Sequence, residues 1–131
     1  SADTTFTLGG AWTTVAFAST GWNTGNHYNT SNYRFTVPVA GKYLVTWSWQ
    51  LENNNIADWM YFYPRLNGQN SQDRQAGISF SDFRNEAGYH TENGAWIMNL
   101  LVNDYIDMVF RGIGGVKSFK AESHWSMMLL G

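Results

Sequence analysis

The sequence predicts an all-β fold, a single jelly-roll sandwich of about eight to ten antiparallel strands that spans residues 1–131. Runs rich in Tyr, Trp, Phe, Val and Thr are separated at short intervals by turn clusters that contain Gly and Asn. Several runs alternate apolar and polar residues, and a helical period is hard to find anywhere in the chain. The length of 131 residues is that of one domain.

The apolar runs define the expected strands in chain order. The third run places Tyr43, Trp47 and Trp49 on one face, together with Val45 and Leu51. The fourth is apolar on both faces, and Pro64 removes a ladder donor there, so this strand lies near an edge or ends at a bulge. We expect strands at residues 12–18, 32–37, 42–51, 57–67, 75–80, 94–102, 104–111 and 122–130.

The turns between these strands have residue types that suit them. Pro38 fixes φ and removes a donor, and Gly41 permits a positive φ, so the chain turns sharply between the second and third strands. Asn103 and Asp104 make a tight corner. The longest segment with little strand signal, residues 68–93, is the expected surface loop.

Charge and composition exclude several classes of function. The net charge is −2, and Lys and Arg are scattered singly, so no basic stripe is available to bind nucleic acid. No apolar run reaches 18 residues, which predicts no membrane insertion. Without Cys there is no disulfide and no thiolate chemistry. The first residues show neither a basic nor an apolar signal-peptide region.

The side chains that carry chemistry do not form a recognisable catalytic set, so we expect no enzyme, no catalytic residue and no cofactor. No nucleophile elbow, zinc-protease helix, phosphate loop or dinucleotide motif occurs. His27 is expected to pack in a turn or to be exposed, and no triad partners are identified for His124. His90 lies near Glu86 and Glu92 in a cluster that could hold a metal, although a solvated surface is favoured there. No metal site is expected either.

Aromatic and Asn residues in the expected loops admit a carbohydrate-binding alternative. Sugars stack on Trp and Tyr rings and exchange hydrogen bonds with Asn, so Trp22 and Tyr89 are the better candidates because they neighbour polar loop residues. For Trp59 and Tyr61 we favour a place in the core. The candidate ligand loop contains Trp22, Asn23, His27 and Tyr89.

Residues 21–43, GWNTGNHYNTSNYRFTVPVAGKY, resemble the signature of the jelly-roll heads of complement component one, subcomponent q, within the tumour necrosis factor superfamily. Further along, NLLVNDYIDM at 99–108 resembles the family's Leu-x-x-Gly-Asp-x-Val turn, with Asn103 in place of the Gly. SHWSMMLLG at 123–131 resembles its closing strand. The residues that match the signature are Asn23, Gly25, Tyr28, Phe35, Pro38, Gly41 and Tyr43.

The resemblance implies a homotrimer. In this family three heads pack around a threefold axis through the sheet that holds the first, third, sixth and last strands. Large rings on those strands are many for one small sandwich, and each buries about 150–250 Å². The alternative is that they only fill the core of one subunit. The candidates for core and trimer interface are Tyr43, Trp47, Trp49, Trp96, Met98, Trp125 and Met127.

The family resemblance of residues 21–43 also leaves calcium open as an alternative to plain polar loops. Its candidate oxygen donors are Asn53, Asn54, Asn55, Asn70, Asp73 and Asp82.

The same resemblance implies a function by assembly. Animal relatives carry a collagen-like stalk, and this sequence shows none. Heads of this type without a stalk are similar to surface components of bacterial viruses. We therefore expect a non-enzymatic structural or adhesive protein that acts as a capsid decoration (cement) protein or a fibre tip. Its expected location is the virion surface, and the alternative is that it is an extracellular or otherwise soluble protein. A lectin-like recognition module that binds glycans is the alternative function.

Overall fold

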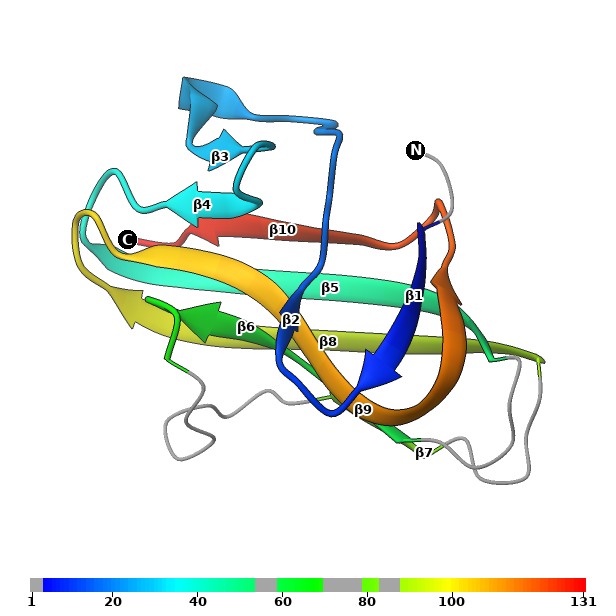
Figure 1. Cartoon of the computed structure of the whole chain (residues 1–131). Helices are drawn as coiled ribbons and strands as arrows, with labels where there is room; N and C mark the ends of the chain where they lie inside the picture. The colour runs from blue at the N-terminus through cyan, green and yellow to red at the C-terminus, as the bar shows by residue number, and fades with distance from the viewer. Residues whose placement is uncertain (1–3, 54–58, 70–78, 83–87) are drawn as a thin grey trace.

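The computed structural model describes residues 4–53, 59–69, 79–82 and 88–131. Over these residues ten antiparallel strands form one continuous hydrogen-bonded network that folds into two packed layers (Figure 1). The strands are β1 (Thr4–Gly9), β2 (Thr13–Thr14), β3 (Tyr28–Asn29), β4 (Arg34–Thr36), β5 (Gly41–Asn53), β6 (Trp59–Leu66), β7 (Ser79–Asp82), β8 (Gly88–Leu100), β9 (Tyr105–Phe119) and β10 (His124–Leu129). The prediction of an all-β sandwich is confirmed, and the arrangement is compatible with a jelly roll.

The first layer consists of β10, β5 and β8, with β5 in the middle. Residues directly opposite one another share a face of the sheet. Trp47 therefore lies between Trp125 of β10 and Gly94 of β8. A Cβ on Gly94 would come within 2.2 Å of the Trp47 ring, so this position admits the indole only because it has no side chain.

The second layer is centred on β9. The strand pairs with β6 on one side and with β4, β2 and β1 in turn on the other, while β7 adds to β6 and β3 to β4. The last residues of β9 also pair with β5, so this curved strand joins the two layers (Figure 1). Pro64 lies inside β6 beyond the residues that pair with β7, where the second side of the strand has no described neighbour, as its missing donor requires.

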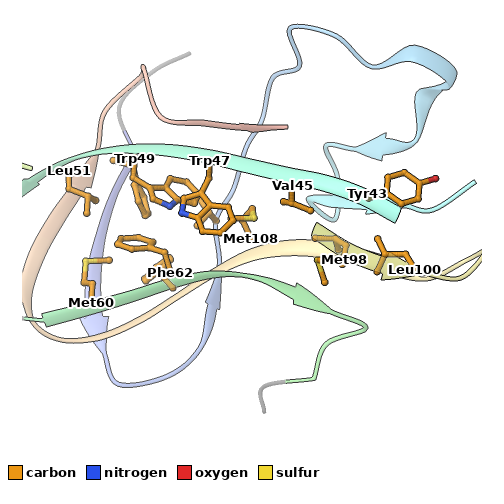
Figure 2. Close-up of a cluster of buried hydrophobic side chains, with 14 of the residues drawn as sticks. Tyr43, Val45, Trp47, Trp49, Leu51, Met60, Phe62, Met98, Leu100 and Met108 are labelled. Carbon is orange, nitrogen blue, oxygen red and sulfur yellow. The ribbon is translucent and has the colours of Figure 1, made fainter. Parts of the chain in front are cut away.

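The core lies between the layers and is largely aromatic. Alternate residues of β5 point inward and meet Met60 and Phe62 of β6 and Met108 of β9 (Figure 2). Trp49 is fully buried, with ring centroids 5.3 Å from Phe62 and 5.2 Å from Phe119. The alternation read from the sequence of β5 therefore describes the core face correctly.

The outer face of the second layer holds a buried ion pair. Arg65 of β6 donates from Nη2 to Oδ2 of Asp107 on β9 at 2.5 Å and from Nε to Oδ1 at 2.9 Å. The Thr14 hydroxyl of β2 donates to the same carboxylate at 2.7 Å and accepts from Arg65 at 3.1 Å. Asp107 is 1% exposed. This network fastens the short strand β2 to the sheet.

Several expected elements differ in extent from the observed ones. Only Thr13–Thr14 of the expected strand 12–18 is a strand, and it pairs with β9 instead of joining the first layer. The strand expected at 94–102 begins already at Gly88, and the one expected at 104–111 continues to Phe119. Part of the expected loop 68–93 is therefore sheet. β1 and β3 were not expected from the sequence.

The prediction for Gly41 is wrong in its reason. Gly41 has no positive φ, unlike Gly10, Gly25 and Gly68. A Cβ on Gly41 would come within 2.8 Å of the Leu129 side chain and 3.0 Å of the Gly131 carbonyl oxygen. A side chain at this position would crowd Leu129 and the backbone of Gly131, which pass close by.

Candidate functional site

The seven residues predicted for the core or the trimer interface all lie on the inner side of the first layer. Tyr43, Trp47, Trp49 and Met98 are at most 5% exposed within a single chain, and Trp96, Trp125 and Met127 pack partly buried against the same core. These side chains bury against their own chain, as the core alternative predicts. The trimer stays a prediction, and its surface has to be sought elsewhere on the subunit.

The outer side of the same layer carries a row of apolar side chains, of which Leu44 in the middle is half-buried and the two flanking ones are exposed. Met128 of β10, Leu44 of β5 and Ile97 of β8 lie directly opposite one another across the three strands. Ile97 and Met128 are 55% and 57% exposed. Leu101 and Leu130, which follow the ends of β8 and β10, are also exposed. We call these five residues the apolar strip.

A groove of about 1110 Å³ lies beside β10. One wall is the inner flank of β10, and the other is the segment Val15–Thr24, which leads from β2 to a 3₁₀ turn at Thr24–Asn26. Tyr28, Phe35 and Tyr43 also line it. The volume is slightly larger than the range of about 300–1,000 Å³ that is typical of ligand pockets.

Three of the four predicted ligand residues line this groove. Trp22, in the outer wall, is 95% exposed. Asn23 does not offer a free amide, because its Nδ2 donates to the Tyr28 carbonyl at 2.8 Å and its Oδ1 accepts from the Tyr28 amide at 3.0 Å. Asn23 therefore closes the loop, and His27 packs edge-on against Phe35. The assignment of Asn23 to ligand binding stays a prediction beside this structural role.

Tyr28 holds the two walls of the groove in place. Its hydroxyl donates to the Phe17 carbonyl oxygen at 3.0 Å, and its ring lies edge-on to Trp125 of β10. Burial raises the pKa of Tyr28 well above its ordinary value of 10.0. The phenol is therefore neutral and committed to one backbone acceptor.

Tyr89, the fourth predicted ligand residue, lies apart from the other three. It is on β8 beside Gln50, Lys120 and Glu122, which with it line a separate shallow depression. The Lys120 ammonium lies 5.4 Å from the centre of the Tyr89 ring and 2.8 Å from a carboxylate oxygen of Glu52. The sequence grouped four residues that the fold divides between two places.

The candidate metal donors find no common site in the described chain. Asn54, Asn55, Asn70 and Asp73 lie outside the described residues, and Asn53 and Asp82 are placed only as residues of β5 and β7. Among the described residues, no group of three His, Asp or Glu side chains could hold a metal ion. His124 Nδ1 contacts the carbonyl oxygen of Glu122 at 2.9 Å.

Sequence reasoning missed the apolar strip, although the signal was present. Met127, Met128, Leu129 and Leu130 run consecutively, so both faces of the last strand are apolar at this end. Ile97 and Leu44 likewise interrupt the polar alternation of their strands. Apolar residues on both faces of a strand indicate that both faces are covered.

The chain was compared with known proteins. No family profile matches it, and no curated protein sequence matches it. In the described part of the chain, the helical residues are limited to the three-residue turn Thr24–Asn26, and no helix is long and apolar enough to span a membrane.

Proposed function

We propose that this protein is a non-enzymatic structural protein that forms a homotrimer and decorates the surface of a larger particle, as a capsid decoration protein or a fibre tip of a bacterial virus. The apolar strip is the observation that carries the assembly part of the proposal. Exposed apolar side chains that gather on one face of a folded protein mark interaction surfaces. Covering such a row removes apolar area from water, which stabilises an assembly by roughly 25 cal/mol per Å².

The place of the strip in the fold supports a trimer. It lies on the outer side of the layer formed by β10, β5 and β8, which correspond to the last, third and sixth strands expected from the sequence. In the family that the chain resembles, three heads pack through the sheet with these strands. The part of the proposal that locates the trimer on a particle surface is supported only by the resemblance to heads without a stalk.

The oligomer can be tested with matched substitutions on β8. Asn93, Ala95 and Ile97 are alternate residues of one strand, so they share the outer face, and Asn93 lies opposite Ser48 in a polar row. We expect light scattering to give three times the subunit mass of 14.9 kDa for the wild type. Ile97→Lys, which places a charge in the apolar strip, is expected to give the subunit mass.

The control variant is Asn93→Lys, which adds the same charge to the same face outside the strip. It is expected to keep the trimer mass. A wild-type protein of 14.9 kDa in solution contradicts the trimer. A trimer that survives Ile97→Lys moves the interface to another surface. Mass spectrometry of purified particles from the source of the gene tests the second part of the proposal, which fails if the protein is absent from them.

Carbohydrate recognition is a second candidate, supported by the exposure of Trp22. An indole that is 95% exposed presents a free face for a sugar ring to stack on. A glycan array probed with wild type and Trp22→Ala tests it, with Tyr89→Ala as the second arm because Tyr89 is also exposed but lies in another depression. Binding that only Trp22→Ala abolishes supports a sugar site in the groove. An array without signal removes the candidate.

A further inference from the structure

β10 is an open edge of the first layer. It pairs with β5 along residues 124–129, and no other described strand pairs with it. Leu130 N donates to the Lys42 carbonyl oxygen at 2.7 Å, which sets the alternation of the ladder. In an antiparallel pair every second residue directs its N–H and C=O to the same neighbour. The backbone groups of Trp125, Met127 and Leu129 therefore point away from β5, toward the groove.

This edge lacks the features that normally prevent pairing. Edge strands of natural proteins are blunted by charged side chains, by Pro, by bulges or by a cover. Residues 123–130, SHWSMMLL, contain no Pro, Lys, Arg, Asp or Glu, and the register of β10 with β5 has no shift. The facing segment Val15–Thr24 lines the groove without bonding to β10. The edge is open to an added strand.

Several polar side chains of the groove are already engaged with the protein itself. Tyr28 donates to Phe17, and the Tyr43 hydroxyl donates to the Val39 carbonyl oxygen at 2.7 Å. Asn23 is bonded to the backbone of Tyr28, and the Ser126 hydroxyl contacts the Thr46 hydroxyl at 2.7 Å. Besides the hydroxyls of Ser19, Thr20 and Thr24 and the His27 ring, the groove offers a ligand the backbone N–H and C=O groups along β10 that do not face β5. A row of such groups along a strand edge suits a polypeptide strand, which pairs through its own backbone.

The charge of the groove limits the occupant further. The wall Val15–Thr24 contains no ionisable side chain, and no Asp or Glu lines the groove. The basic residue types in its lining are His27, His124 and Lys120, and the Lys120 ammonium is paired with Glu52. A neutral groove with Tyr28, Phe35 and Tyr43 along it complements a neutral segment with an apolar side chain at every second position.

We propose that the groove is a strand-acceptor site, which binds an extended, uncharged segment of another protein chain by backbone pairing with the free edge of β10. The added strand extends the first layer beyond β10 and directs alternate side chains onto the aromatic rings of the groove. Strand addition of this kind takes affinity from main-chain hydrogen bonds and specificity from pockets for alternate side chains. The site requires neither the trimer nor a virion, because its walls belong to one subunit.

The test uses a displayed library of random dodecapeptides selected on the full-length protein. Enriched peptides are expected to be uncharged with alternating apolar residues. Each peptide is then synthesised in two forms, one N-methylated at the odd residues and the other at the even residues. The form whose methyl groups replace the N–H donors that face β10 is expected to bind about tenfold or more weakly, a loss of about 1.4 kcal/mol. The other form is expected to bind like the unmodified peptide.

Two measurements on the protein complete the test. Met127→Pro removes an N–H that faces the groove, at an edge position where Pro is tolerated, and is expected to weaken peptide binding about tenfold or more, whereas Asn93→Lys on the outer face does not. On the unaltered protein, hydrogen exchange at the amides of Trp125, Met127 and Leu129 is expected to slow about tenfold or more on binding, with Leu130 unchanged.

The negative outcomes are equally defined. A library that yields no enriched peptide overturns the proposal, and so do peptides that tolerate both methylation patterns. Oligosaccharide binding that leaves the exchange of the three edge amides unchanged assigns the groove to sugars instead. If Met127→Pro does not fold, the methylated peptides and the amide exchange decide without it.

Discussion

At the scale of single residues, the contact between Trp47 and Gly94 shows how closely the core is fitted. The two lie directly opposite on β5 and β8, and a methyl group on Gly94 would overlap the indole. Trp47 is 3% exposed and packed against the core, so the ring has little room to move. We expect Gly94→Ala to lower the free energy of unfolding by about 1–3 kcal/mol, measured by urea denaturation.

The control for this prediction is Gly21→Ala. Gly21 has open space where its Cβ would be built and no positive φ, so the same substitution meets no obstacle there. Loss of backbone freedom in the unfolded chain is expected to leave stability unchanged or raise it by up to about 1 kcal/mol. Equal losses at both sites contradict the packing argument for Gly94.

A second residue-scale prediction concerns alkaline pH. Burial raises the pKa of Tyr28 and of Tyr63 above the ordinary value of 10.0. Below about pH 10 these phenols are neutral in the folded and unfolded states, whereas above it the unfolded chain ionises first. The free energy of unfolding is therefore expected to fall as the pH rises above about 10, and to fall less in Tyr28→Phe or Tyr63→Phe.

Denaturant titrations at pH 8 and at about pH 11 measure this difference. Tyr89→Phe serves as the control, because Tyr89 is 66% exposed in the folded protein, whereas Tyr28 becomes partly buried on folding. Its pH dependence is expected to follow the wild type. A wild-type stability that stays flat up to about pH 11 contradicts the effect of burial on the two phenols.

Single residues also show how far the sequence could predict local structure. Asn103 stands where the resembled family has Gly, and its φ of 69° confirms that the turn needs the left-handed conformation, which Asn tolerates. Gly41 was also predicted to have a positive φ, but it does not have one. Its lack of a side chain instead leaves room for the backbone of Gly131. A turn is local and readable, whereas contact with the far end of the chain depends on the whole fold.

At the scale of elements, the ion pair of Arg65 and Asp107 fastens β2 to the second layer. Asp107→Asn leaves the Arg65 guanidinium with an uncompensated charge at a largely buried site. Breaking a buried pair on one side costs about 3–5 kcal/mol, and we expect a loss of that order in urea denaturation. The double variant Arg65→Met with Asp107→Leu removes both charges and is expected to recover most of it.

A second ion pair provides the comparison. Glu52 and Lys120 approach to 2.8 Å, but the Glu52 side chain is 32% exposed and water screens the pair. Glu52→Gln is expected to cost at most about 1 kcal/mol. If it costs as much as Asp107→Asn, burial does not explain the strength of the inner pair.

Whole elements were predictable where alternation was clear and unpredictable where it was not. β5 was expected at 42–51 and runs from Gly41 to Asn53, because its inward residues are nearly all large and apolar. The first half of β8 was missed because its sequence, GYHTEN, is polar on both faces, and the end of β9 because GIGGVK is rich in Gly. Their strand state comes from pairing with β5 and β1, which is tertiary in origin.

At the scale of the whole molecule, the sequence showed that large rings alternate along β5 but not which side of the layer faces a partner. A period of two separates an apolar face from a more polar one, but it does not show whether the apolar face is buried within the subunit or against another chain. Packing against β6 and β9 decides this, since Trp49 meets Phe62 and Phe119 of the second layer. The apolar row is then on the opposite face, where the side chains are Leu44, Ile97 and Met128.

The two faces of the first layer lead to a prediction that separates stability from assembly. Trp49 is 0% exposed within one chain, so Trp49→Ala removes packing from the subunit and leaves the apolar strip in place. We expect it to lower the free energy of unfolding by about 3–5 kcal/mol and to keep the oligomeric mass of the wild type as long as it is folded.

Ile97→Lys is expected to behave in the opposite way. Ile97 is 55% exposed, so its replacement leaves the core intact and acts on assembly. Urea denaturation at dilutions where the wild type is dissociated should give both proteins the same stability within about 0.5 kcal/mol, while light scattering at higher concentration separates their masses. A Trp49→Ala protein that stays folded but becomes monomeric would contradict this separation. It would mean that the loss of packing on the inner face of the layer also disrupts the interface on its outer face.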